Sequence, residues 1–125
     1  MNTINYTEKF NSIFNEFIDD IVETYPDDTS MHLYKFAISG AMMMNQNMIM
    51  QGFNTHVVIP FGEQLLNKEE SFFLNHDYKD IAGINTAMDF IERLKGYWVE
   101  MPQNNRDIIW KYFRILILIC NKVYL

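Results

Sequence analysis

The stretch "IIWKYFRILILIC", Ile108–Cys120, decides the fold of this 125-residue chain, because it is almost entirely apolar. A membrane-spanning helix needs about 20 consecutive, predominantly apolar residues to cross about 30 Å of hydrocarbon. This stretch has thirteen residues and contains Lys111 and Arg114. It is too short and too charged to cross a bilayer, so we expect no membrane span.

As an α-helix from about 105 to 123, the same region has a broad apolar stripe and a narrow polar face. The stripe contains Ile109, Tyr112, Phe113, Leu116, Ile119, Cys120 and Val123, and its flanks contain Ile108, Ile115, Ile117 and Leu118. A helix that is apolar nearly all round normally lies at the centre of a globular bundle. The alternative is a helix whose second face is buried by another subunit.

A second regular pattern begins near the N-terminus and predicts a helix over 7–24. Its apolar residues recur at helical spacing, namely Phe10, Ile13, Phe14, Phe17, Ile18, Ile21 and Val22. Thr7 is the expected N-cap. The helix should end by Tyr25, because the residue before Pro26 is pushed out of the α-helical region.

The next predicted helix runs from about Ser30 to Met50 or Gln51, after a turn in which Asp27, Asp28 and Ser30 supply capping groups. Its expected buried stripe contains Leu33, Phe36, Ala37, Gly40, Ala41, Met44, Met48 and Gln51. The small residues Gly40 and Ala41 would allow a neighbouring helix to approach closely.

The middle of the chain predicts short helices. The β-prone triplet 57–59 is followed at once by Pro60 and Gly62 and has no partner strand, so we expect a short helix, then a second one to Leu66. Asn67 is a good N-cap for a further turn that Phe72, Phe73 and Leu74 would anchor to the core. After a connection over 76–85, with Asn85 or Thr86 as cap, a helix over 86–100 should turn Met88, Ile91, Leu94, Trp98 and Met101 inward.

The chain is therefore expected to form one all-α domain over 1–125, a compact bundle of five or six helices around the C-terminal helix. With 49% apolar and 15% aromatic residues, it has ample material for one core. The expected core anchors are Phe14, Phe17, Trp98, Trp110, Phe113 and Leu116.

The net charge and the cysteine content of the chain argue against some classes of function and some locations in the cell. The net charge of -6 disfavours direct binding to nucleic acid, which normally needs clustered Lys and Arg. The single cysteine, Cys120, allows no intrachain disulfide and favours a reducing compartment. The N-terminus has no basic region followed by an apolar run, so we expect no signal peptide and an intracellular or virion location.

We expect that the chain is not an enzyme and that it has no cofactor site and no metal site. His32, His56 and His76 have no second ligand at metal-binding spacing. The carboxylate pairs at 19–20, 27–28 and 69–70 are sequence neighbours whose side chains diverge, whereas acid–base catalysis needs convergent ones. A helix N-terminus or a solvated face explains all three pairs.

The methionine-rich run "AMMMNQNMIM" suggests an interaction surface, because methionine is flexible and suits irregular partners. If the core face contains Met44 and Met48, then Met43 and Met50, seven residues apart, share another side, with Met42 on its flank. We therefore predict that Met42, Met43 and Met50 border a surface for a protein partner or for self-association. The alternative is a wide core face filled by adaptable side chains.

Three segments resemble a pattern in small uncharacterised proteins of large nucleocytoplasmic DNA viruses. They are "FNSIFNEFIDDIVETYPDD" at 10–28, "NKEESFFL" at 67–74 and "RDIIWKYFRILILICNKV" at 106–123. The resemblance implies a viral protein that is virion-associated or an assembly factor, and it assigns no catalytic residue. The expected function is a helical structural or protein-interaction component. The alternatives are an accessory subunit of viral replication or transcription and a host-directed inhibitor that binds a helix in a groove.

Overall fold

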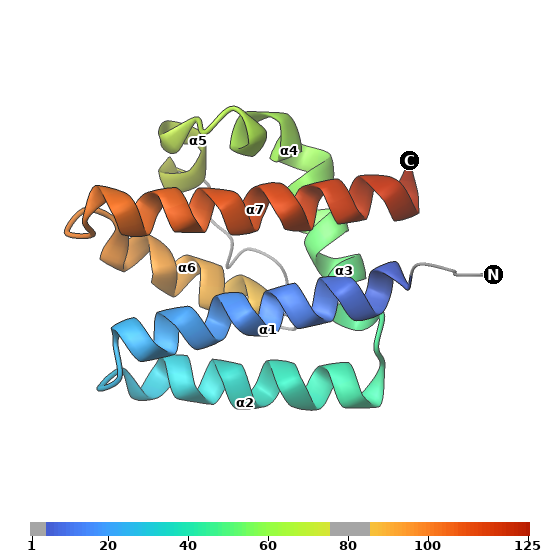
Figure 1. Cartoon of the computed structure of the whole chain (residues 1–125), viewed down its shortest axis with the longest axis horizontal. Coiled ribbons are helices and arrows are strands. Elements are labelled where there is room, and N and C mark those ends of the chain that lie inside the picture. Colours follow the sequence, from blue (N-terminus) through green and yellow to red (C-terminus); the bar gives the residue numbers. More distant parts are fainter. Residues whose placement is uncertain (1–4, 76–85) are drawn as a thin grey trace.

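A computed structural model describes residues 5–75 and 86–125, and these residues form helices and no strand (Figure 1). The elements are α1 (Tyr6–Thr24), α2 (Thr29–Met44), α3 (Met48–Phe53), the π-helical turn η1 (Asn54–Val58), α4 (Ile59–Leu66), α5 (Glu70–Asn75), α6 (Thr86–Trp98) and α7 (Gln103–Tyr124). The all-α prediction is confirmed. The predicted connection over 76–85, with His76 and Asn85, lies outside the described residues.

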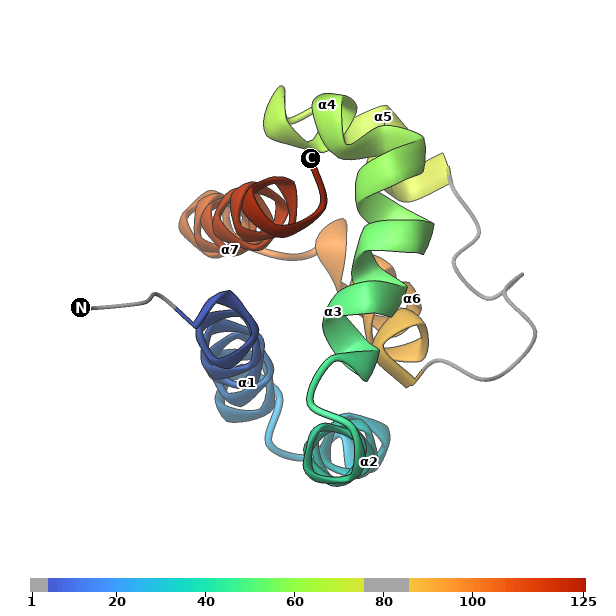
Figure 2. The same ribbon diagram turned by 90° about the vertical axis from the view of Figure 1, so that its right-hand side faces the viewer.

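Helix α1 lies between α7 on one side and α2 on the other (Figure 1). Seen along these helices, the run α3–η1–α4 rises from beside α2 to above α7, and α6 contacts both α2 and α3 (Figure 2). The core fills the space that these elements enclose. Helix α2 therefore forms one outer edge of the bundle.

Helix α1 buries the predicted stripe, with Phe10, Phe14 and Phe17 fully inaccessible to solvent. Its N-cap is Asn5, whose Oδ1 accepts a hydrogen bond from the Glu8 N–H at 3.0 Å. The prediction of Thr7 as N-cap is wrong, because the helix begins one turn earlier than its apolar stripe. The end is as predicted, since the helix stops at Thr24, before Tyr25 and Pro26.

The core is mainly aromatic. The Phe17 and Tyr112 rings stack with centroids 4.8 Å apart, and Trp98 meets Trp110 edge-on at 5.2 Å. Such pairs contribute about 0.5–1.5 kcal/mol beyond their area burial. All six predicted core anchors are buried, namely Phe14, Phe17, Trp98, Trp110, Phe113 and Leu116. The predicted inward residues of the 86–100 helix are also buried.

Helix α7 buries most of its predicted stripe between α1 on one side and η1 and α4 on the other. Its polar face is wider than predicted, because Ile108, Ile115 and Leu118 are 39–45% exposed. Val123, which was expected in the stripe, is also partly exposed. Neighbouring helices cover α7 only on the side that faces the bundle, so one flank is left to solvent (Figure 2).

The β-prone triplet of the middle region is helical, as expected, and Pro60 lies at the start of α4. Gly62 belongs to a close approach, since a Cβ there would lie 3.3 Å from Val58 Cγ1 and 3.7 Å from Ile117 Cγ2. An alanine at this position would require the Val58 side chain to shift by a few tenths of an ångström.

The prediction of Asn67 as an N-cap is wrong, because Asn67 is the residue that ends α4. Lys68 then takes a left-handed conformation, with φ of 56°, which turns the chain before α5 begins at Glu70. Phe73 is buried as expected and Leu74 is partly buried. Phe72 is 44% exposed and contributes less to the anchor than predicted.

The single helix predicted over 30–50 is broken after Met44. The Asn45 side chain accepts a hydrogen bond from the Asn47 N–H at 3.0 Å, which turns the backbone away from the axis of α2. Asn11 on α1 donates a hydrogen bond from Nδ2 to the Gln46 carbonyl at 2.9 Å and ties the turn to the bundle. Met43 and Met50 consequently lie on different helices.

Candidate interaction surface

Helix α2 has two apolar faces, and its neighbours bury one of them. The inward face contains the buried residues Met31, Ile38 and Met42, with Tyr34 and Ala41 partly buried beside them. The outward face contains Leu33, Phe36, Ala37, Gly40, Met43 and Met44, and we call these six residues the α2 outer face. At about 100° per residue they span about 120° of the helix and about 17 Å of its length.

Large apolar side chains on the α2 outer face are almost fully accessible. Phe36 is 82% exposed, Met43 89% and Met44 87%, while Leu33 is 62% exposed. A Cβ built on Gly40 would meet no described atom within 4 Å. In Figure 2, α2 is at the lower edge of the molecule, with its contacts on the side of α1, α3 and α6.

The sequence prediction for this helix is wrong about which face is buried. Leu33, Phe36 and Met44 were expected in the core and are exposed. A helix with apolar residues on both faces has no strong intrinsic preference for either. The sequence already contained a signal for the other face, since Met31, Ile38 and Met42 also recur at helical spacing.

The predicted surface methionines separate in the structure. Met43 lies on the surface as predicted, but Met42 is 9% exposed and Met50 is 2% exposed, and both belong to the core. The prediction for these two residues is wrong for different reasons. Met42 points inward because the buried face of α2 is the other one, and Met50 lies beyond the break, on α3.

A polar cluster around Asp28 holds α2 in this rotation. Asp28 Oδ1 accepts a hydrogen bond from the Met31 N–H at 3.1 Å and thereby caps α2. Its Oδ2 accepts from Arg93 Nε at 2.7 Å and from the Tyr97 hydroxyl, both on α6. Burial opposes ionisation, but these hydrogen bonds and the Arg93 charge outweigh it and lower the pKa of Asp28 to about 2.

A second contact holds α2 from the opposite side. Lys35 Nζ lies 2.6 Å from Asp19 Oδ1 of α1, with both side chains partly exposed. Surface ion pairs of this kind contribute at most about 1 kcal/mol. The pair joins the inward side of α2 to α1, and none of the six residues of the α2 outer face has a charged side chain.

The charge distribution singles out the same region. All sixteen acidic residues lie outside 29–62, so Asp28 and Glu63 bound 34 residues without a carboxylate side chain. Lys35 is the only Lys or Arg in this segment. In a chain of net charge -6, the α2 outer face is thus a neutral apolar surface within an acidic molecule.

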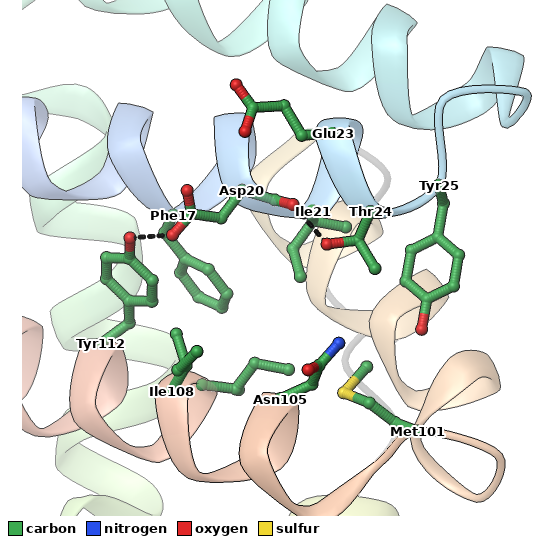
Figure 3. Close-up of a pocket in the computed structure, with 11 residues that line it drawn as sticks. Phe17, Asp20, Ile21, Glu23, Thr24, Tyr25, Met101, Asn105, Ile108 and Tyr112 are labelled. Carbon is green, nitrogen blue, oxygen red and sulfur yellow. Dashed lines mark hydrogen bonds between the residues drawn. The ribbon is translucent and has the colours of Figure 1, made fainter.

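The structure also has a cleft of about 340 Å³ between the second half of α1 and the first half of α7 (Figure 3). Its walls include Phe17, Ile21 and Ile108, and the Tyr112 hydroxyl donates a hydrogen bond to Asp20. Burial and the Asp20 interaction raise the pKa of Tyr112. Figure 3 shows Glu23 directed away from the cleft floor, so the two carboxylates do not converge on a reacting group.

The other candidate chemical groups remain dispersed. His32 Nε2 lies 2.8 Å from the Pro26 carbonyl oxygen, and the described residues contain no group of three His, Cys, Asp or Glu side chains that could hold a metal ion. Burial raises the pKa of the Cys120 thiol to about 12, which keeps it protonated and unreactive. The described parts of the chain also lack a helix that is both long and apolar enough to cross a membrane.

We compared the chain with known protein families, curated proteins and solved structures. No protein-family model, no curated protein and no solved structure matches the chain.

Proposed function

We propose that this chain is a non-enzymatic protein-interaction component and that it binds through the α2 outer face. One observation supports this proposal: four large apolar side chains on one face of a single helix are 62–89% exposed. Contiguous apolar patches larger than a few hundred Å² are rare on monomeric proteins and usually mark contacts.

The energetics favour occupancy of this face. Fully burying a side chain such as Phe36 or Met44 contributes about 1.5–3 kcal/mol. The backbone of α2 is already ordered by its contacts with α1 and α6. Binding of a partner therefore requires little additional loss of backbone conformational entropy in α2.

We further propose that the component serves a large DNA virus, as a virion-associated protein or an assembly factor. The three segments that resemble small proteins of such viruses support this part of the proposal. Quantitative mass spectrometry of purified particles tests it. Stoichiometric incorporation is expected, and absence from particles would contradict a virion role.

Site-specific photo-crosslinking tests the binding surface itself. Benzoylphenylalanine at position 36 should form covalent adducts in cells that express the full chain. The control is the same probe at Val99, which is 75% exposed and lies outside α2. Adducts at position 36 that are absent at position 99 are the expected result. An equal yield at both positions, or none at either, would refute the proposal.

A further inference from the structure

We propose that the occupant of the α2 outer face is a second copy of this chain, bound antiparallel across a twofold axis between Ala37 and Gly40. This inference rests on the proposed function and names the partner.

The arrangement of side-chain sizes is self-complementary. The small residues Ala37 and Gly40 lie at the middle of the α2 outer face, with Leu33 and Phe36 toward one end and Met43 and Met44 toward the other. In an antiparallel pair centred there, Ala37 of each copy meets Gly40 of the other and Leu33 meets Met44. A twofold contact requires this reciprocity of one surface with itself.

Space for close approach exists at the centre. Apart from the adjoining residues and backbone of α2 itself, the described part of the chain places no atom within 4 Å of a Cβ at Gly40. Two helices can therefore approach closely at this point, while the bulky residues on either side pack against the partner helix. Met43 and Met44 can adjust their three side-chain torsions to the opposing Leu33 and Phe36.

The exposed apolar area is at the low end of what a specific contact between proteins needs. Taking on the order of 150 Å² for each large side chain, the exposed fractions leave about 500 Å² of apolar surface per copy. If all of this surface is covered, two copies bury about 1,000 Å² before the polar rim is added, which is the lower limit for a specific interface.

Charge favours a second copy over an electrostatically recruited partner. Like charges would repel two acidic molecules at most places on their surfaces. The 29–62 segment has no carboxylate side chain, and its Lys35 is paired with Asp19 of the same chain. Two neutral faces can therefore meet without this penalty, and they offer no charge to an oppositely charged protein.

The first test measures the mass of the purified chain by light scattering across a range of concentrations. We expect twice the mass of one chain for the wild type. Phe36→Glu and Met44→Glu should each weaken self-association at least tenfold, while Val99→Glu leaves it unchanged. A wild type that stays monomeric at millimolar concentration, or a dimer that survives both α2 substitutions, would overturn the inference.

The second test fixes the geometry with a matched pair of cysteines. Gly40 and Gly96 are both exposed residues inside helices, and a Cβ at either would meet no described atom within 4 Å. Under mild oxidation, Gly40→Cys should form a covalent dimer and Gly96→Cys should not. The native Cys120 is buried and stays out of the reaction. Equal cross-linking of the two variants would overturn the proposed geometry.

The photo-crosslinking result separates this inference from the proposed function. Adducts from position 36 with the mass of two chains support both. If position 36 forms adducts with a different protein and the wild type is monomeric, the self-association inference is refuted. The proposed interaction function is then still supported. No adduct from position 36 would end both.

Discussion

Two adjacent methionines on α2 have opposite environments, so they should differ in the substitutions that they tolerate. Met42 is 9% exposed and packs in the core, whereas Met43 is 89% exposed. One step along a helix turns a side chain by about 100°, which here is the difference between core and solvent. The same polar substitution should therefore destabilise the fold at Met42 and leave its stability nearly unchanged at Met43.

We expect Met42→Glu to destabilise the fold by about 3 kcal/mol or more, because it buries a carboxyl group without a partner. Met43→Glu should change the free energy of unfolding by no more than about 0.5 kcal/mol. Urea denaturation of both variants, at concentrations where the chain is monomeric, measures the difference. Comparable losses would place Met43 in the core.

Asp28 is the residue whose ionisation stabilises the position of α2. Its pKa is about 2 in the folded chain and 3.8 in a reference peptide, so ionisation favours folding. The contribution is fully present above about pH 4 and is lost as pH falls toward 2. A shift of this size corresponds to about 2 kcal/mol.

Between pH 5 and pH 2, the wild type should therefore lose about 2 kcal/mol more stability than Asp28→Asn does. Asp27→Asn, at the exposed neighbouring position, is the matched control and should follow the wild type. Thermal unfolding monitored by circular dichroism across this pH range provides the measurement. Parallel curves for wild type and Asp28→Asn would contradict the role of the ionised carboxylate.

At the scale of elements, the turn at Asn45–Asn47 and the π-helical turn η1 determine how the middle of the chain crosses the bundle. The turn ends α2 and lets α3 pack against α1 and α6. Helix α4 then continues from η1 to α7, where Gly62 lies close to Ile117. Side-chain contacts at Gly62 therefore help to position α4 against η1 and α7.

Alanine substitutions at two glycines should show how tightly the surrounding side chains are packed. Gly96→Ala in α6 should stabilise the fold by about 0.5–1 kcal/mol, since its Cβ meets open space and alanine favours the helix. Gly62→Ala should gain less or lose stability, because its Cβ would lie 3.3 Å from Val58 Cγ1. Chemical denaturation measures the free energy of unfolding of both variants. An equal gain in stability would show that the side chains around Gly62 accommodate a Cβ without strain.

At the scale of the whole molecule, the chain is acidic, and among the described residues α2 has a neutral face of strongly exposed apolar side chains. The net charge is -6, and the basic residues of α7, such as Lys111 and Arg114, form no extended cluster. Phosphate backbones need clustered cations that release bound counterions. We therefore expect recognition of protein surfaces and not of nucleic acid.

Duplex DNA should bind with a dissociation constant weaker than about 10 µM at physiological salt. Fluorescence anisotropy with a labelled duplex, repeated at several salt concentrations, measures this. Submicromolar binding with a steep salt dependence would contradict the expectation. A basic DNA-binding domain of similar size serves as the positive control.

The sequence alone was sufficient to predict the all-α class, the regions in which α1, α6 and α7 lie, and the aromatic core anchors. These features follow from single stripes such as Phe10–Phe14–Phe17, where one face is apolar and the other charged, so that burial has one solution. Helix α2 is different, because both of its faces are apolar. Which of them is buried was decided only in the tertiary structure, where α1 and α6 cover Met31, Ile38 and Met42 and the Asp28 cluster holds the helix in place. The α2 outer face exists because packing against one bundle can bury only one side of a surface helix.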